Sequence, residues 1–122
     1  MKGFYITIAL FLALMISGIL NFLFINNVYS EMNEMISDIS EFPCPENEEK
    51  IKRLSEYWEE VNSIVGISVN FLSIDSVSNL IDSVYVYNEQ GDDIQLSYSI
   101  ELLINAVENI KRLEVFSIKN IL

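Results

Sequence analysis

Carboxylates are the most abundant side chains in this chain that could do chemistry, and three of them surround one glycine. Glu89, Asp92 and Asp93 flank Gly91 in the stretch NEQGDD. Oxygen ligands gathered in one turn suit a hard cation such as Ca²⁺. The stretch lacks the alternating ligand spacing and the distal glutamate of a calcium-binding loop. We therefore expect a solvated turn here, with no metal or cofactor site.

The remaining candidates for catalysis are equally sparse. Glu56, Glu59 and Glu60 are close in sequence, but neighbouring carboxylates on an exposed helix face usually contact only water. The chain contains no histidine, which excludes the common zinc ligand sets and histidine-based nucleophile pairs. Its four glycines are scattered and form no phosphate-binding loop. We predict that the protein is not an enzyme, and a carboxylate-based, divalent-ion-binding exported protein stays open as an alternative.

The sequence contains one tryptophan and one cysteine, and each could have a functional role. Trp58 lies in the middle of an apolar helical pattern, so we expect it to be a core residue and not a ligand-stacking surface. Cys44 is the chain's one cysteine and lies between Pro43 and Pro45. It cannot form an intramolecular disulfide, and we expect an ordinary turn cysteine whose chemical state the sequence leaves open.

The element that places all these residues is a run of 22 mainly apolar residues, from Phe4 to Ile25, that contains no charge. As a helix it would be roughly 33 Å long, enough to cross a hydrocarbon core of about 30 Å. We interpret it as a transmembrane helix. Asn21 is expected near the outer interface. In an alternative hypothesis, Asn21 and Gly18 contact a partner helix, and the protein caps a larger membrane complex.

A cleaved signal peptide would begin in a similar way. The apolar run is longer than the roughly 7 to 15 residues of a signal core, and no A-x-A-like site follows it directly. We therefore predict an uncleaved anchor over residues 1–25, with cleavage after Ser30 as the alternative.

The charges on either side of the run predict its orientation. Lys2 precedes the run, whereas the first charged residues after it are all acidic. Basic flanks stay in the cytoplasm, so we expect a single-pass cell-membrane protein with a cytoplasmic amino terminus and an extracytoplasmic remainder. All 18 acidic residues lie in that remainder, and the chain's net charge is −11. This charge argues against nucleic acid as a partner; we expect the lipid bilayer and, as an open possibility, another membrane or envelope protein.

Helical periodicity organises the rest of the chain. After the run, apolar residues recur every three or four positions, which predicts a helical stalk over 26–42 that ends before Pro43. A domain over 45–122 follows. Its first helix begins at Pro45, with acidic residues in its first turn and one apolar face. The apolar positions of the stalk are Val28, Met32, Met35, Ile39 and Phe42, and those of the helix are Ile51, Leu54, Trp58, Val61 and Val65.

Two segments allow two interpretations. Residues 67–71 alternate like a strand, although a helix capped by Ser73 or Asp75 could follow them. Residues 84–100 could form a β-hairpin around Gly91. The apolar face Leu96, Ile100, Leu103, Val107 and Ile110 extends beyond a typical strand and favours a helix. We predict an all-α fold, in which a small antiparallel bundle of about three helices follows the anchor and stalk; the alternative is α+β with that hairpin.

The carboxyl-terminal residues are unusually apolar. Five of the last eight are Val115, Phe116, Ile118, Ile121 and Leu122. We expect them to dock against the chain's own bundle and thereby close its core, and the alternative is insertion into a partner's groove.

Several of these features occur together in one known family. They are the single membrane helix, Trp58, Ile74-Asp75 with Val77, Glu108-Asn109-Ile110 and the closing FSIKNIL of residues 116–122. Together they resemble the small bacterial membrane-anchored proteins of the domain-of-unknown-function family 4363. The resemblance implies an all-helical exterior part and no assigned activity. This chain lacks the histidines that the family often has near the positions of Asn70, Phe71 and Asn109.

These observations predict a non-enzymatic interaction or structural module of the bacterial cell envelope.

Overall fold

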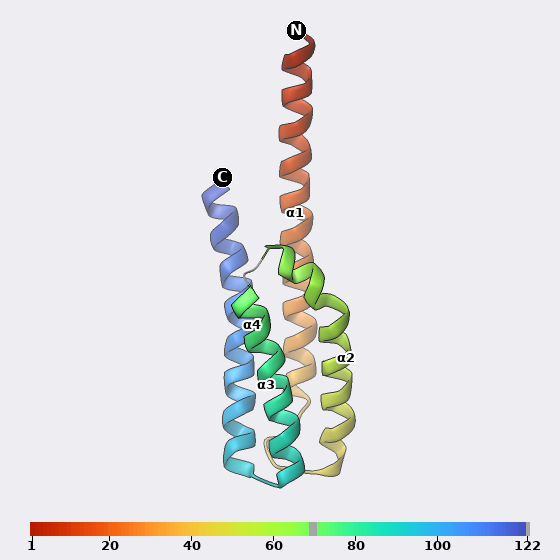
Figure 1. Ribbon diagram of the computed structural model, residues 1–122, viewed down its shortest axis with the longest axis vertical. Coiled ribbons are helices and arrows are strands. Elements are labelled where there is room, and N and C mark those ends of the chain that lie inside the picture. The colour runs from red at the N-terminus through yellow and green to blue at the C-terminus, as the bar shows by residue number, and fades with distance from the viewer. Residues whose placement is uncertain (69–70, 122) are drawn as a thin grey trace.

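The computed structural model describes the backbone of residues 1–68 and 71–121, and the side chains of residues 1–65 and 72–113. These residues form four helices: α1 (Lys2–Ser37), α2 (Pro45–Ser68), α3 (Phe71–Gln90) and α4 (Asp93–Ile121). Consecutive helices run in opposite directions, and the amino-terminal half of α1 rises alone above the others (Figure 1). The predicted all-α fold is confirmed, and no strand occurs in the described residues.

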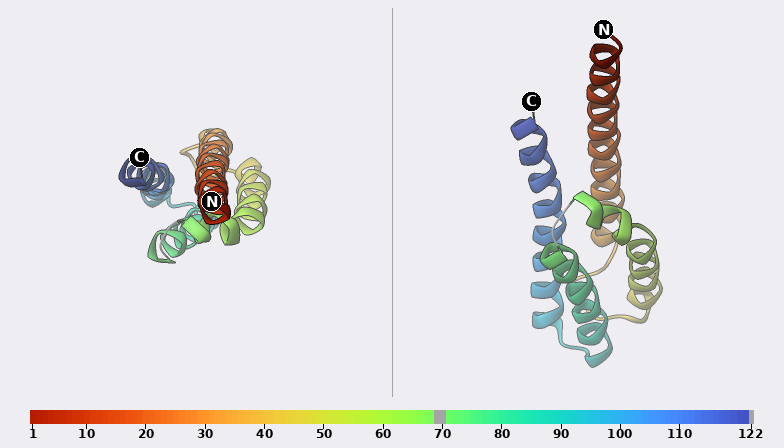
Figure 2. Two further views of the ribbon diagram at one scale, coloured as in Figure 1. Left: turned by 90° about the horizontal axis from the view of Figure 1, so that it is seen from above. Right: turned by 45° about the horizontal axis from the view of Figure 1, so that its top comes forward.

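The carboxyl-terminal half of α1 is part of the bundle. Ile25, Val28, Met32 and Ile36 are buried, and α1 contacts both α2 and α4. α3 contacts α2 and α4 in turn, so the four helices form a closed ring when seen along the bundle axis (Figure 2). The segment that we expected to be a stalk therefore supplies the first helix of a four-helix bundle.

The core lies between the four helices and follows the apolar faces read from the sequence. All five positions of the predicted α4 face are buried, because their spacing of three and four residues keeps them on one side of the helix. The buried apolar residues are Ile25, Val28, Met32 and Ile36 of α1, Ile39 of the first loop, Ile51, Leu54, Trp58 and Val65 of α2, Val77, Ile81 and Val84 of α3, and Leu96, Ile100, Leu103, Val107 and Ile110 of α4.

α1 ends five residues earlier than we expected. Its last helical residue is Ser37, and residues 38–44 form a loop. The loop turns Ile39 into the core, whereas Phe42, which we placed on the apolar face of the stalk, is 70% exposed. The Ser37 hydroxyl donates to the Glu34 carbonyl at 2.8 Å, a local bond of the kind that competes with helix continuation. Pro45 begins α2, as predicted.

The β-hairpin over residues 84–100 is wrong. This segment forms the end of α3 and the start of α4, joined by a two-residue turn. Gly91 has φ +69° in that turn, a left-handed conformation that costs glycine nothing. Asp92 then caps α4, because its Oδ1 accepts a hydrogen bond from the Gln95 backbone N–H at 3.1 Å.

The connection between α2 and α3 also differs from the strand interpretation. α2 continues through Gly66 to Ser68, and α3 begins at Phe71. Ser73 and Asp75 therefore lie inside α3 and do not cap it. Val69 and Asn70 lie outside the described residues.

Candidate functional site

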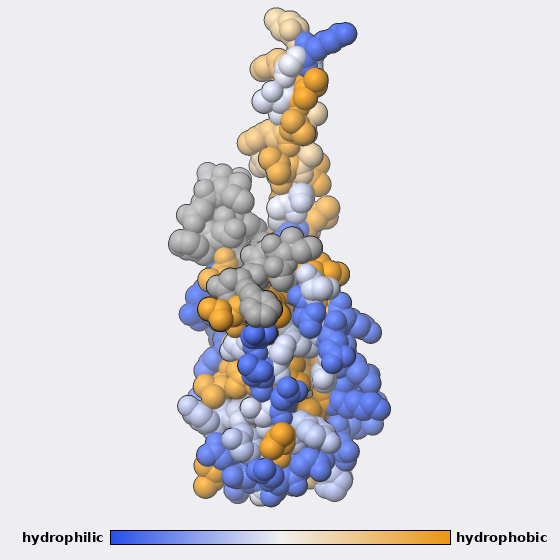
Figure 3. All heavy atoms as spheres, viewed as in Figure 1, coloured by the Kyte–Doolittle hydropathy of each residue, from blue (hydrophilic) through white to orange (hydrophobic). Residues whose placement is uncertain are grey.

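The amino-terminal half of α1 is the most distinctive surface of the molecule. Most of its large apolar side chains are more than half exposed, and only 6% of its most apolar 18-residue window is buried. A core helix of a soluble protein would be mostly buried. The space-filling view shows this half of α1 as mainly apolar, above a bundle whose visible face is largely polar (Figure 3). By length and composition it can cross a membrane.

The uncharged run and the buried part of α1 meet at one residue. Ile25 is the last residue of the run and the first buried residue of α1. One turn further on, the Tyr29 ring on α1 lies under the Lys111 ammonium of α4, with Nζ 4.5 Å from the ring centroid. Tyrosine and lysine are typical of the zone between lipid and water. The surface that we interpret as an anchor is therefore continuous with the bundle through one unbroken helix.

Gly18 and Asn21 are the residues for which we considered a partner helix. A Cβ added at Gly18 would meet no heavy atom within 4 Å, so this side of α1 is open. Asn21 is half-buried near the upper end of the bundle.

The opposite end of the molecule is closed by a buried polar cluster. Asn47, in the first turn of α2, is fully buried. Its Nδ2 donates to the Ser40 carbonyl at 3.0 Å, the Phe42 carbonyl at 3.2 Å and Asn88 Oδ1 at 3.0 Å. Its Oδ1 accepts from the Ser40 N–H at 2.9 Å. One side chain thus holds the loop between α1 and α2 in place.

Asn88 connects the same loop to α3. Its Oδ1 accepts from the Cys44 N–H at 3.1 Å, and its Nδ2 donates to the Cys44 carbonyl at 3.3 Å. Cys44 is a free, half-buried cysteine of a turn, as expected. Neither asparagine was among the residues predicted from the sequence. The signal for Asn47 was its position two residues after Pro45, and nothing local marked Asn88.

Trp58 is a core residue, as predicted. It is 3% exposed, and its indole Nε1–H donates to Ser78 Oγ at 2.8 Å. A buried indole needs such an acceptor. The bond joins the middle of α2 to α3, so Trp58 is not available for ligand stacking.

The acidic side chains that we examined do not converge. Glu89 and Asp93 are exposed, and Asp92 acts as the cap of α4. Glu56, Glu59 and Glu60 are exposed on α2. Within the described residues, no group of three or more Asp, Glu, Cys or His side chains could hold a metal ion.

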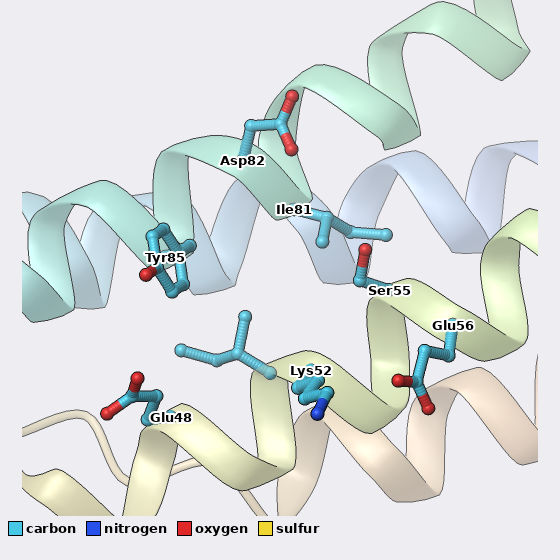
Figure 4. A pocket seen from close by; sticks show the side chains of 8 residues that line it. Glu48, Lys52, Ser55, Glu56, Ile81, Asp82 and Tyr85 are labelled. Atoms are coloured by element: carbon cyan, nitrogen blue, oxygen red, sulfur yellow. The ribbon is translucent and has the colours of Figure 1, made fainter.

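A shallow hollow of about 330 Å³ lies between α2 and α3. Its floor includes Ile81 and Tyr85, and Ser55 faces it from α2 (Figure 4). The carboxylates of Asp82 and Glu56 point away from the space between the two helices, in opposite directions (Figure 4). The hollow therefore offers a mixed polar and apolar surface and no assembled catalytic group.

Tyr57 is a half-buried phenol on α2. Burial raises the pKa of its phenol above the ordinary value of 10.0, and the carboxylates of Glu31 and Glu60 raise it further. A raised pKa keeps the phenol protonated and neutral near pH 7, so it can donate a hydrogen bond but supplies no charge.

The family model described as a domain of unknown function, DUF4363, matches residues 22–121. This range covers the whole bundle and only the last four residues of the uncharged run. No curated protein matches the chain, and no solved structure matches it.

Proposed function

We propose the following role for this chain, which belongs to the DUF4363 family: a non-enzymatic, single-pass membrane protein whose acidic helical bundle lies outside the cytoplasm. There the bundle acts as an interaction or structural module of the cell envelope. The exposed apolar half of α1 carries this proposal. An isolated helix with so many apolar side chains in water is unfavourable, and a bilayer removes that surface from water.

The magnitude of this effect favours a membrane. Fully burying one large apolar side chain is worth about 1.5–3 kcal/mol, and 12 large apolar side chains between Phe4 and Leu23 are 41–73% exposed. Their transfer from water into lipid is therefore worth tens of kcal/mol, on the order of several times the stability of a small domain. Lys2 at one end and the acidic residues after Ile25 support the orientation.

The surface of the bundle supports a binding role more than a catalytic one. The hollow between α2 and α3 is open, and the carboxylates at its edge face solvent. The chain's excess of acidic residues favours a partner that presents basic groups. We propose another membrane or envelope protein as that partner.

The first experiment tests the anchor. The full chain with an amino-terminal affinity tag is expressed in bacteria, and the membranes are washed with alkaline carbonate. We expect the protein to stay in the membrane pellet. A variant with Leu10→Lys and Leu14→Lys should leave the pellet, and it should keep a folded bundle because both side chains are exposed, by 61% and 73%. An unchanged distribution of the double variant would refute membrane insertion.

The second experiment tests orientation and partners. Ile94→Cys in a Cys44→Ser background places a thiol at a site that is 76% exposed. A membrane-impermeant maleimide should label it in intact spheroplasts, whereas labelling only after permeabilisation would refute the extracytoplasmic orientation. Capture through the tag from detergent-solubilised membranes then identifies the partner. Recovery of the protein as a monomer without any partner would contradict the interaction role. Co-purification of a complete channel or transporter would instead indicate that the protein caps a larger membrane complex.

A further inference from the structure

We infer that the carboxyl-terminal turns of α4 enter the outer leaflet of the same bilayer that α1 spans. This inference rests on the proposed membrane anchor and adds a second contact of the chain with lipid. It concerns residues 115–121, whose backbone continues α4 without interruption.

The register between α1 and α4 places this segment. Lys111 of α4 lies over the Tyr29 ring of α1, and the two helices run in opposite directions side by side (Figures 1 and 2). Because both rise by about 1.5 Å per residue, residue 115 is level with Ile25, the last apolar residue before Asn26 and Asn27. Residue 121 is then level with residue 19. The last turns of α4 therefore extend about 9 Å past the predicted membrane boundary.

That depth fits one leaflet. A hydrocarbon core of about 30 Å leaves about 15 Å on either side of the midplane. α4 would enter the outer half of this core without reaching the centre. Lys119 is about 6 Å past the boundary by the same register, a depth at which lysine side chains extend to the interface.

The apolar residues of the segment are not confined to one face of the helix. Residues 115–121 read VFSIKNI and contain four apolar residues. At about 100° per residue, positions 116 and 118 lie on opposite sides of the helix axis. Packing against the chain's own bundle covers only one side, whereas lipid surrounds the helix. We expected self-docking from the sequence; that expectation concerns side chains outside the described residues, and the helix register favours lipid instead.

Described residues at the boundary support the same placement. Lys111 and Arg112 provide two basic groups at the level expected for phosphates. Leu72, at the start of α3, is 78% exposed and lines a hollow with Asn109, which places it near this level. An apolar side chain so exposed next to α4 at this level would contact the interface.

The test measures the environment of single labelled thiols in proteoliposomes that contain the full chain. In a Cys44→Ser background, a fluorescent label is attached at Ile118→Cys, at Leu12→Cys in the anchor, or at Ile94→Cys at the distal end. Leu12 and Ile94 are 51% and 76% exposed. Each label is quenched by nitroxide lipids, with the nitroxide near the headgroup or near the chain end, and by aqueous iodide. Trp58 emission confirms that each labelled bundle is folded.

We expect the label at residue 118 to be quenched several-fold more by headgroup-proximal nitroxide than the label at residue 94, and several-fold less by iodide. The label at residue 12 should respond most to the deep nitroxide. Iodide quenching at residue 118 equal to that at residue 94, with residue 12 still in lipid, would overturn this inference alone. Protection of residue 118 from both quenchers would also overturn it, in favour of a protein contact. A label at residue 12 that iodide quenches would overturn the proposed anchor.

Discussion

Replacing Asn47 tests whether the polar cluster at the base holds the bundle together. Asn47→Ala removes polar contacts of 2.9–3.2 Å to four partners, which join α2 to the preceding loop and to Asn88 of α3. Because the amide has two N–H groups shared among three acceptors, these contacts amount to about three full hydrogen bonds. Each bond contributes about 1 kcal/mol net. The Phe42 carbonyl belongs to an exposed residue, so water can replace its partner. We therefore expect a loss of about 3 kcal/mol in the free energy of unfolding.

Urea unfolding of the detergent-solubilised full chain measures this loss. Trp58 is the chain's one tryptophan and is buried in the core, so its emission reports the folded bundle. With an m-value of about 1.5 kcal/mol per M, the midpoint should fall by about 2 M. Asn79→Ala is a matched control, because Asn79 is exposed on α3 and its replacement should change stability by less than about 0.5 kcal/mol.

A double variant separates the cluster from a simple packing effect. Asn47 and Asn88 share one hydrogen bond of 3.0 Å. The losses of Asn47→Ala and Asn88→Ala should therefore sum to about 1 kcal/mol more than the loss of the double variant. A loss below about 1 kcal/mol for Asn47→Ala, or strict additivity, would refute the reasoning, because the bonds would then contribute little in solution.

Two further changes test the turn and the phenol. Gly91→Ala should cost about 1 kcal/mol in urea unfolding, because φ is +69° and nothing lies within 4 Å of the added Cβ. Gly91→Asn should cost less, since asparagine adopts this conformation more readily; equal costs would contradict a conformational cause. Because its pKa is raised, Tyr57 binds its proton more tightly in the folded state than in the unfolded state. This contribution to the free energy of unfolding is fully present below the ordinary value of 10.0 and is lost as pH rises above that value. Tyr57→Phe should reduce the fall in urea midpoint between about pH 9 and pH 11, and an identical fall in both proteins would contradict this assignment.

The sequence predicted the helices best where one pattern was long. The α4 face from Leu96 to Ile110 repeats over four turns, and every predicted position is buried. The hairpin alternative relied on alternation that included Tyr85, Ile94 and Tyr98, which are 45%, 76% and 58% exposed. The sequence pattern of these exposed apolar residues resembled that of a β-strand, because alternation alone does not show which residues are buried.

The end of α1 could not be predicted for a different reason. The apolar spacing allowed the helix to continue to Phe42, and no local residue forbids this before Pro43. The loop depends instead on Asn47 and on Asn88, which is 41 residues further along the chain from Asn47. Such tertiary contacts have no signal in a local pattern.

α1 is one unbroken helix that is exposed in its first half and buried in its second, and this limits where a binding partner of the bundle can lie. No linker separates Ile25 from the core, so the bundle cannot turn freely relative to the anchor. From Ile25 to Ser37 the helix rises about 18 Å. The α2–α3 hollow is lined by the first half of α2 and the second half of α3, toward the end of the bundle away from α1's exposed half. With the proposed membrane anchor, a partner that binds the hollow must therefore lie within roughly 30 Å of the lipid surface. Membrane proteins and proteins held at the membrane meet this condition continuously, whereas a freely diffusing partner would meet the acidic bundle only through a separate encounter.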